Sequence, residues 1–288
     1  MIPGSFEYHR PTSIADAVGL LIQLGEDARV LAGGHSLIPM MKLRLATPRH
    51  LIDLGDVKDL KGVGSDGSDI VIGAMTTQHE AIASDVLAAK VPILKETALQ
   101  IADPQVRYCG TIGGNVANGD PGNDMPAVMM CLGAIYEVRG PNGQRRIAAR
   151  DFYEGAYFTA LEPGEIVTAI RIPTPTAGHG YAYKKLKRKI GDYATAAAAV
   201  VLTMRGDKAA SCSIGLTNVA ERPLWAEEAS NILTGSALDA ATVKKAIAAA
   251  EKITSPATDN RGPAAYRTKV AGVMLARALA QARERAKP

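Results

Sequence analysis

The chain has 288 residues, of which 47% are hydrophobic and 22% are charged, and its formal net charge is +4. Such a length accommodates two domains, and the composition is that of an ordinary core-forming globular protein. The small charge excess argues against a dedicated nucleic-acid binder. No apolar run approaches the roughly 20 residues that span a bilayer, which argues against a transmembrane helix. The first residues lack the pattern of a signal peptide.

The N-terminal half alternates helix and strand signals. Ser13 precedes apolar residues at helical spacing that end before Gly25, which predicts a first helix. A helix at 37–45 between strands at 29–32 and 50–54 indicates an α/β unit. The further expected elements are a strand at 70–72, a helix opened by a capping box at 77–80, helices at 91–102 and 124–132, and strands at 134–139 and 165–172.

A proline- and glycine-rich linker at 173–180 separates this half from the rest. The elements expected beyond it are three strands and then two helices, at 181–187, 195–204, 212–216, 238–252 and 266–285. Strands followed by helices indicate a smaller domain of the α+β class. We therefore expect an α+β protein with a first domain over 1–177, in two subdomains of about 1–55 and 56–177, and a C-terminal domain over 178–288 with a three-stranded antiparallel sheet and helices.

Two loops combine a glycine pair with small polar residues. They are Ala-Gly-Gly-His-Ser at 32–36 and Thr-Ile-Gly-Gly-Asn at 111–115. A pyrophosphate needs backbone N–H groups that converge on its oxygens without side chains in the way, and glycine permits that approach. Ser36 and Thr111 add hydroxyl donors. Each glycine pair can also be no more than a tight turn, so the residues alone leave both interpretations open.

The segment 62–67, Gly-Val-Gly-Ser-Asp-Gly, matches the dinucleotide fingerprint Gly-x-Gly-x-x-Gly. That fingerprint binds phosphates only when a strand precedes it and a helix follows, because the helix N-terminus faces the phosphates. Here a strand follows. We interpret the segment as a hairpin turn and expect no NAD site.

The run Lys-Lys-Leu-Lys-Arg-Lys at 184–189 is flanked by Tyr181, Tyr183 and Tyr193. Basic residues interleaved with aromatics can bind nucleic acid, but this run is short and the rest of the chain is near charge balance. Three interpretations stay open: a solvated or partner-facing strand, a contact with a cofactor, and a nucleic-acid surface.

The chain offers no obvious metal or catalytic motif. Its three cysteines stand alone, and its histidines show no metal-ligand spacing, so we expect no disulfide, no zinc and no iron–sulfur cluster within the chain. Only His35 lies in a candidate site, and His9, His50, His79 and His179 are expected to be surface or capping residues. We expect a cytoplasmic protein without metal ligands or catalytic residues of its own.

Taken together, the two glycine loops resemble the FAD motifs of a known family. Loop 32–36 with the following Leu-Ile-Pro-Met-Met-Lys-Leu-Arg, and loop 111–115 with the following Asn118 and Asp124-x-Pro126, are similar to the xanthine-dehydrogenase-type flavin domain of the molybdenum hydroxylases. Further similar segments run along the whole chain, at 6–11, 73–77, 165–173 and 184–194. The resemblance implies an FAD-binding fold of the vanillyl-alcohol-oxidase and xanthine-dehydrogenase type.

The resemblance implies a role for each matching position. The residues implied around the pyrophosphate are Ala32, Gly33, Gly34, His35, Ser36 and Leu37 on one side and Thr111, Gly113, Gly114 and Asn115 on the other. Those implied at the ribityl or diphosphate region are Asn118, Asn123 and Asp124, and Ile101 is implied as an apolar flavin contact. Lys184, Asp192 and Tyr193 lie in the segment that brings the C-terminal domain over the isoalloxazine, where Tyr193 is placed to stack on the ring or shield it.

The resemblance also implies partner chains. In the family, a large subunit oxidises the substrate at a molybdenum cofactor, and a small subunit relays electrons through two [2Fe–2S] clusters to FAD, which passes them to a quinone-type acceptor. The His of the first loop and the run after it are most similar to medium subunits of aerobic carbon monoxide dehydrogenases. That branch implies oxidation of CO with water to CO2, with copper beside a molybdenum–molybdopterin cytosine dinucleotide on the large subunit. It also implies a dimer of heterotrimers and at most peripheral association with the cytoplasmic face of the inner membrane.

Three other functions remain open at this point. Subunits that act on aldehydes or aromatic N-heterocycles have close variants of both loops. A free-standing flavin oxidoreductase would need its own substrate pocket, and the scarcity of aromatics and of a His- or Tyr-based acid–base pair argues against it. A nucleic-acid-binding module would use the basic run and bind no flavin.

Overall fold

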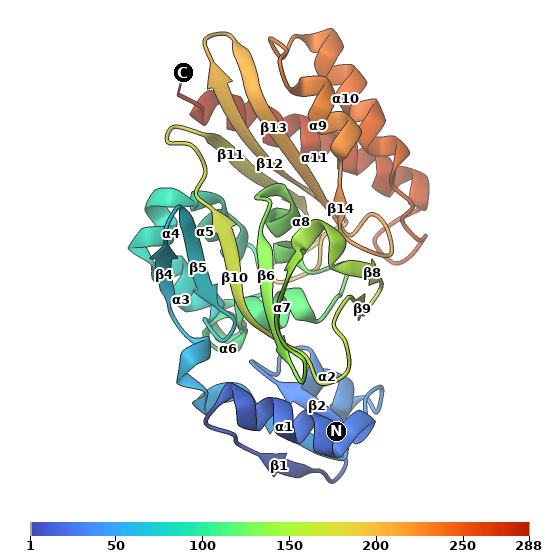
Figure 1. Ribbon diagram of the computed structural model, residues 1–288. Helices are drawn as coiled ribbons and strands as arrows, with labels where there is room; N and C mark the ends of the chain where they lie inside the picture. Colours follow the sequence, from blue (N-terminus) through green and yellow to red (C-terminus); the bar gives the residue numbers. More distant parts are fainter. Residues whose placement is uncertain (1, 288) are drawn as a thin grey trace.

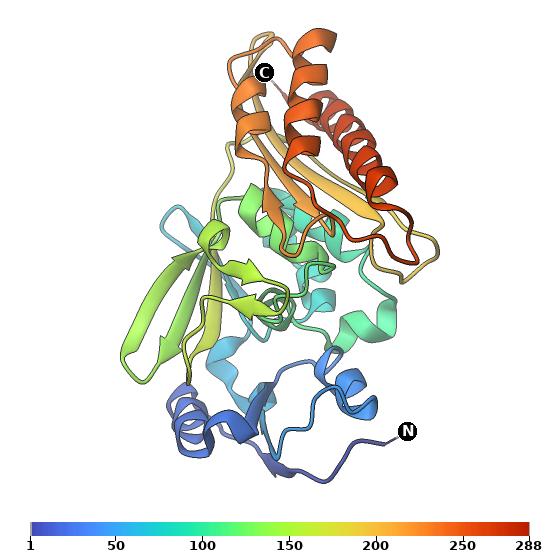
Figure 2. The same ribbon diagram turned by 90° about the vertical axis from the view of Figure 1, so that its right-hand side faces the viewer.

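The protein, described here by a computed structural model over residues 2–287, consists of three parts stacked along one axis. Figure 1 shows a small N-terminal lobe at one end, a central part built on a five-stranded sheet, and a C-terminal domain at the other end. Figure 2 shows the same order from the side, with the helices of the C-terminal domain on the outer face of their sheet.

The N-terminal lobe is a parallel three-stranded sheet in the order β1-β3-β2, with one helix packed on it. Its elements are β1 (Glu7–His9), α1 (Ile14–Leu24), a 3-10 turn (Gly25–Asp27), β2 (Ala28–Leu31), α2 (Leu37–Lys42) and β3 (His50–Asp53). Helix α1 begins as expected, because the hydroxyl of Ser13 accepts a hydrogen bond from the Asp16 N–H at 3.1 Å. The expected α/β unit is therefore confirmed.

The central part is built on an antiparallel sheet in the order β4-β5-β10-β6-β7. Its strands are β4 (Val63–Asp66), β5 (Asp69–Gly73), β6 (Ile135–Gly140), β7 (Gly143–Ala148) and β10 (Ile166–Pro173), beside a two-stranded ribbon of β8 (Tyr153–Gly155) and β9 (Phe158–Thr159). Its helices are α3 (Gln78–Ala83), α4 (Asp85–Lys90), α5 (Pro92–Ala98), α6 (Pro104–Cys109), α7 (Ile112–Ala117) and α8 (Asp124–Cys131), with 3-10 turns at Leu54–Asp56, Lys58–Leu60 and Ala149–Asp151.

The segment that imitates a dinucleotide fingerprint belongs to a hairpin. Residues 63–66 form β4, which pairs antiparallel with β5, and Asp66 opposes Asp69 at the turn. No helix follows the segment, so it lacks the helix N-terminus that would face a pyrophosphate. The interpretation as a hairpin is confirmed.

The C-terminal domain is an antiparallel sheet in the order β11-β12-β13-β14 with three helices. Its elements are β11 (Gly180–Leu186), β12 (Ala196–Arg205), β13 (Lys208–Thr217), β14 (Leu224–Trp225), α9 (Glu227–Leu233), α10 (Ala240–Lys252) and α11 (Ala264–Arg285). The three expected strands are present, and the two-residue β14 adds a fourth at the edge. A strand this short carries no periodic signal, which is why the sequence did not predict it.

Strand β12 explains how the C-terminal domain is attached. Its residues alternate between two cores: Ala197 and Ala199 face the central part, whereas Ala198, Val200 and Leu202 face the helices of the domain. An almost unbroken apolar strand is what burial on both faces requires. The sheet therefore lies as a layer between α8 of the central part and α11 of its own domain.

Some expected boundaries differ from the observed ones. The helix expected at 91–102 ends at Ala98, and the helix expected at 37–45 ends at Lys42. The capping box is confirmed, since the Thr77 hydroxyl accepts from the Glu80 N–H at 3.1 Å and the Thr77 N–H donates to the Glu80 carboxylate at 2.7 Å. Strand β7 was not predicted, because it is an edge strand whose one buried apolar side chain is Ile147.

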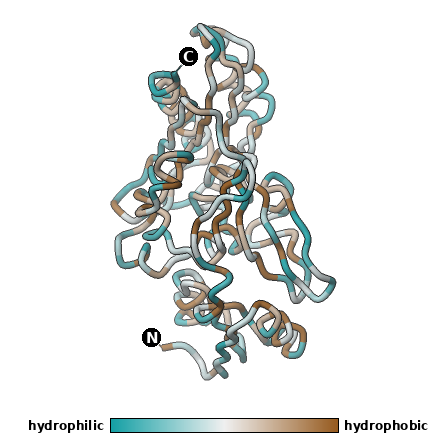
Figure 3. The backbone as a smooth tube through the Cα atoms, turned by 60° about the vertical axis from the view of Figure 1, so that its left-hand side comes forward, coloured by the Kyte–Doolittle hydropathy of each residue, from teal (hydrophilic) through white to brown (hydrophobic). Residues whose placement is uncertain are grey.

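Hydrophobic stretches along the chain are short and are interleaved with hydrophilic ones, as Figure 3 shows. Within residues 2–287, no helix combines the length and the apolar character needed to cross a bilayer.

Candidate functional site

A cavity of about 1140 Å³ extends from the N-terminal lobe along the central part to the C-terminal domain. This volume lies just above the roughly 300–1,000 Å³ typical of small-molecule sites, so the cavity can hold a large ligand. The predicted site residues that line it are Ala32, Gly33, Gly34, His35, Ser36, Leu37, Ile101, Thr111, Gly113, Gly114, Asn115, Asn118, Asn123, Asp124, Asp192 and Tyr193. Of the predicted set, only Lys184 lies outside the lining.

The first glycine loop connects β2 to α2. Gly34 has φ +75°, a left-handed backbone conformation that favours glycine, and it turns the chain into the helix. Ser36 is the N-cap residue of α2, but its side chain makes no capping hydrogen bond. Its hydroxyl is therefore available to a ligand, and the side chain of His35 beside it is exposed.

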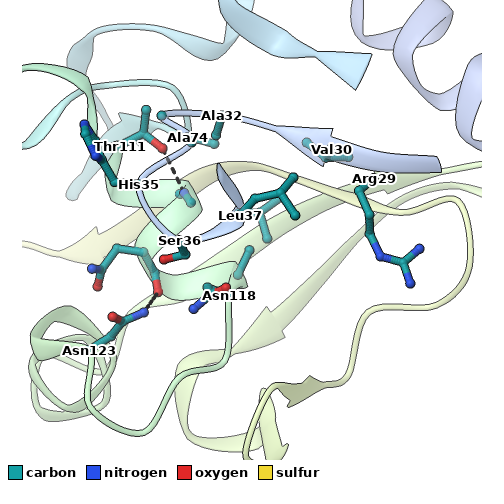
Figure 4. A pocket seen from close by; sticks show the side chains of 18 of the residues that line it. Arg29, Val30, Ala32, His35, Ser36, Leu37, Ala74, Thr111, Asn118 and Asn123 are labelled. Atoms are coloured by element: carbon teal, nitrogen blue, oxygen red, sulfur yellow. Dashed lines mark hydrogen bonds between the residues drawn. The ribbon is translucent and has the colours of Figure 1, made fainter. Parts of the chain in front are cut away.

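The second glycine loop forms the first turn of α7. Thr111 is the N-cap, and its hydroxyl accepts a hydrogen bond from the Gly114 N–H at 3.0 Å. Figure 4 shows Ser36 of the first loop and Thr111 and Asn118 of the second segment around the same space. The two loops, about 80 residues apart in sequence, therefore form two walls of one site.

The glycines also let the backbone segments around the site pack closely. A Cβ on Gly33 would lie 2.2 Å from the carbonyl oxygen of Cys109, and one on Gly113 would lie 2.5 Å from the Cβ of Ala74. One on Gly114 would lie 3.3 Å from the Cβ of Ala32, across the two loops. Two of the glycines, Gly33 and Gly113, are thus required by protein packing, and not by room for a ligand alone.

Several buried polar atoms of the cavity wall lack a hydrogen-bond partner within the described chain. They are both side-chain amide atoms of Gln78, Oδ1 of Asn115 and Nδ2 of Asn118. Asn123 is satisfied, because its Nδ2 donates to the Asn115 carbonyl at 2.8 Å. Buried polar groups almost always have partners, so these atoms call for ordered water or a ligand that offers both hydrogen-bond donors and acceptors. FAD, with its ribityl and phosphate oxygens, fits this set.

The end of the cavity near the C-terminal domain contains a buried charged cluster. Lys185 donates to Asp124 at 2.8 Å, and the Tyr183 hydroxyl donates to the same carboxylate. The side chains of Lys185 and Asp124 are 1% and 5% exposed. Burial raises the pKa of the Asp124 carboxyl, against the opposing attraction of Lys185. Both Asp124 and Lys185 line the cavity, so the pair holds a charged, hydrogen-bonding wall at this end.

Tyr193 borders the cavity beside Gly122. A Cβ on Gly122 would lie 3.0 Å from the Tyr193 ring, and the hydroxyl donates to Asp120 at 3.1 Å. Tyr157 donates to the same carboxylate at 3.2 Å. Burial raises the pKa of Tyr193, which therefore stays a neutral donor. Its hydroxyl is held by Asp120, and the residue remains 40% exposed at the edge of the cavity.

The structure places Lys185, and not Lys184, at the cavity. Successive side chains of a strand point to opposite faces, so Tyr183 and Lys185 of β11 face Asp124 while Lys184 faces the other way. Lys184, which the resemblance implied as a site residue, therefore does not line the cavity, and its neighbour Lys185 does. The sequence lacked the information that decides which face of β11 is covered.

The basic run does not form a continuous exposed face. Lys185 is buried against Asp124, Lys187 donates to the Gln100 carbonyl at 3.3 Å, and Arg188 pairs with Asp192 at 3.1 Å. In these contacts, Lys184 and Lys189 are the basic residues of the run that have no partner. The interpretation as a nucleic-acid surface loses the patch on which it depended.

Two family descriptions match almost the whole chain. Residues 4–175 match the FAD binding domain in molybdopterin dehydrogenase, and residues 181–282 match the CO dehydrogenase flavoprotein C-terminal domain. The chain belongs to the FAD-binding flavoproteins of the molybdopterin dehydrogenases. This membership confirms the expected fold, FAD as the expected cofactor and the family resemblance.

Relatives within the family match over their full length. The chain is 71% identical to the carbon monoxide dehydrogenase medium chain of Afipia carboxidovorans, with all of both chains covered, and 50% identical to that of Hydrogenophaga pseudoflava, with 97% of both covered. A crystal structure of a Cu,Mo-CO dehydrogenase in its cyanide-inactivated form contains a chain that matches with a TM-score of 0.99, over 99% of this chain and all of that one.

Sequence reasoning missed several residues that line the cavity, among them Ala74, Gln78, Tyr157 and Lys185, and also Asp120, whose carboxylate accepts from Tyr157 and Tyr193. Gln78 follows Thr77, the N-cap of α3, and Thr77 pairs with Thr111 of the second loop, so Gln78 lies at the cavity. Neither the residue type of Gln78 nor its position in the sequence indicates a place at the cavity. Asp120, by contrast, lies in the glycine-rich segment 110–122, where a polar residue between two loops is a usable signal.

Proposed function

We propose that the chain binds one FAD with its pyrophosphate between loop 32–37 and loop 111–115 and its isoalloxazine near Tyr193 and the Asp124–Lys185 pair. When bound, FAD supplies a centre that takes up and releases electrons. The residues of this chain supply phosphate contacts, hydrogen bonds along the ribityl chain and a fixed electrostatic environment for the ring. None of them has to act as an acid or base.

The observation that carries this proposal is the elongated cavity lined by both glycine loops, with polar atoms of Gln78, Asn115 and Asn118 buried and unpartnered on its wall. If the two loops were only tight turns, the unpartnered polar atoms beside them would have no explanation. Satisfying a buried donor or acceptor removes a penalty of about 1–3 kcal/mol, so a ligand that reaches all of them gains affinity from atoms already in place.

We further propose that the chain works as the electron-transfer subunit of a CO dehydrogenase complex. The large molybdenum- and copper-containing subunit would oxidise CO with water to CO2, two protons and two electrons. A small subunit with two [2Fe–2S] clusters would deliver the electrons, a quinone-type acceptor would remove them, and the assembly would be a dimer of heterotrimers in the cytoplasm. Full-length identity of 71% and 50% to CO dehydrogenase medium chains supports this branch over the aldehyde- or heterocycle-oxidising ones.

The first test is FAD uptake by the full-length chain. The chain is purified with excess FAD, desalted, and its visible flavin absorption is compared with its protein concentration. One FAD per chain is expected. A chain that never takes up FAD contradicts the proposal, and salt-sensitive retention on a polyanion without flavin would instead favour a nucleic-acid module.

Asn118→Leu separates a binding role of the orphaned donor from a structural one. The change is nearly isosteric and removes a buried N–H donor without a partner, so the stability of the flavin-free chain should be unchanged or higher. FAD affinity should fall by up to about tenfold, the value of one hydrogen bond. Equal FAD affinity in Asn118→Leu and wild type would exclude a contact between this donor and FAD.

The second test concerns partners. The FAD-loaded chain is mixed with CO alone, and then with CO and the large and small subunits, and bleaching of the flavin absorption is followed. Reduction is expected only in the presence of both subunits. Reduction of the isolated chain by a small substrate would favour a free-standing flavin oxidoreductase.

A further inference from the structure

Strands β1 and β3 bring three possible metal ligands together at the edge of the N-terminal lobe. The two strands pair in parallel, with Glu7 opposite His50 and His9 opposite Ile52. Nε2 of His9 lies 3.2 Å from Nδ1 of His50, which lies 3.4 Å from a carboxylate oxygen of Glu7. Within residues 2–287, this is the one group of three His, Cys, Asp or Glu residues whose ligand atoms all lie within 4.8 Å of one another.

These separations are those of ligands around one small metal ion. Zinc–nitrogen bonds of about 2.0–2.1 Å at tetrahedral angles place two ligand atoms about 3.3 Å apart. The observed 3.2 and 3.4 Å need little rearrangement to match. Two imidazole nitrogens and one carboxylate oxygen form a donor set that favours Zn²⁺ and related first-row ions over Mg²⁺ or Ca²⁺, which prefer oxygen ligands.

The His50 imidazole lies close to the core of the lobe. His50 and Ile52 are two residues apart in β3, so they share one face of the sheet, and Ile52 is fully buried in the core under α1. The His50 side chain is only 19% exposed, whereas the Glu7 side chain is 73% exposed and can adjust to an ion. The cluster thus combines two partly buried histidines with one exposed carboxylate that can adjust to an ion.

Neighbouring cations do not compete for the carboxylate. Arg10 pairs with Asp56 at 2.5 Å, and Arg49 lies 3.8 Å from Asp27. The hydroxyl of Tyr8 donates to Asp53. The charged groups adjoining the cluster are therefore directed to other partners, and the Glu7 carboxylate is left to the two histidines.

We propose that Glu7, His9 and His50 form a binding site for one Zn²⁺-like divalent ion, with water completing the coordination. Two of its ligands come from β1 and one from β3, so the ion joins the first strand of the lobe to the centre of its sheet. The three residues are absent from the lining of the large cavity, so the proposal does not depend on FAD. His9 and His50, expected from sequence to be surface or capping residues, are separated by 41 positions, which is why no ligand spacing was visible.

The test is calorimetric titration of the full-length chain with Zn²⁺, in parallel with His9→Ala, His50→Ala and the matched control His79→Gln. One Zn²⁺ per chain is expected. His9→Ala and His50→Ala should each weaken binding by at least the roughly 10–100-fold that loss of a residue supporting a metal ligand costs, and His79→Gln should leave it unchanged. Glu7→Gln should weaken it less, because that ligand is the exposed one. Absence of zinc binding by the wild type, or equal affinity in His9→Ala and wild type, overturns the proposal.

Two further measurements distinguish loss of the metal site from loss of the fold. Cu²⁺ added to the wild type should give an electron paramagnetic resonance spectrum with coupling to two nitrogens, reduced to one in His9→Ala. Zn²⁺ should raise the unfolding temperature of wild type and His79→Gln but not of His9→Ala, since only a ligand bound to the folded state stabilises it. A rise that persists in His9→Ala shows that zinc binds elsewhere and contradicts the assignment. FAD content should be the same in all variants.

Discussion

The two ends of the large cavity are built from different chemistry. The glycine end, residues 32–37 and 111–115, consists of backbone, small hydroxyls and close packing between loops. The charged end, Asp124, Tyr183, Lys185, Asp192 and Tyr193, consists of long side chains brought from α8, β11 and the segment before β12. A dinucleotide has the matching polarity along its length: phosphates at one place and a redox-active ring at another.

The difference also decides what each end tolerates. The glycine end depends on the absence of side-chain atoms, so it fails by steric overlap. The charged end depends on complete pairing, because a buried ion without its partner is costly. The effects of substitutions on stability should therefore differ between the two ends in size, in pH dependence and in which second change restores stability.

The largest effect is expected at the charged end. Lys185→Met leaves the buried Asp124 carboxylate without its cation, which typically costs about 3–5 kcal/mol of stability. Lys184→Met, the same substitution one residue earlier and on the opposite face of β11, should cost about 0.5 kcal/mol or less. Urea unfolding of both variants measures the difference. Equal losses would mean that the face assignment of β11 is wrong.

The loss in Lys185→Met should depend on pH. Burial raises the pKa of Asp124, and removal of Lys185 takes away the main opposing influence. A carboxyl with a raised folded-state pKa contributes stability below its ordinary pKa, and that contribution is lost as pH rises through the raised value. Relative to wild type, Lys185→Met should therefore be less destabilised at about pH 5 than at about pH 8. A loss that is flat or grows on acidification contradicts this sign.

At the glycine end, Gly113→Ala should destabilise the protein by about 1–3 kcal/mol, the usual cost of overpacking, because its Cβ would lie 2.5 Å from that of Ala74. Gly19 gives the matched control. It lies in α1, and a methyl group added there would have no heavy atom of another segment within 4 Å, so Gly19→Ala should stabilise by about 0.5–1 kcal/mol. Thermal unfolding of both variants tests the opposite signs.

The smallest effect is expected at the cap of α7. Thr111→Val removes the oxygen that accepts the Gly114 N–H and should cost about 1 kcal/mol, while Thr111→Ser keeps the cap and should cost much less. A larger loss of stability in Thr111→Ser than in Thr111→Val would mean that the methyl group of Thr111, and not its hydroxyl, is the important part.

The glycine end could be predicted from sequence because its features are local: both loops, the N-cap Thr111 and the start of α2 are each defined by a few consecutive residues of the chain. The charged end could not, because it depends on the register and face of β11. Lys184 and Lys185 are the same residue type in adjacent positions, and only the packing of β11 against α5 and its hydrogen bonds to Asp124 of α8 distinguish them. The His9–His50 contact was hidden for the same reason, since parallel pairing joins strands far apart in sequence.

Hydrogen exchange of the full-length chain with and without FAD shows directly which segments the cofactor covers. We expect slower exchange of backbone N–H groups at 33–37 and 113–115 on FAD binding, with protection also near Tyr193, because the phosphates and the ring cover these two places. FAD that binds without protecting either glycine loop would contradict the assignment of the phosphate site.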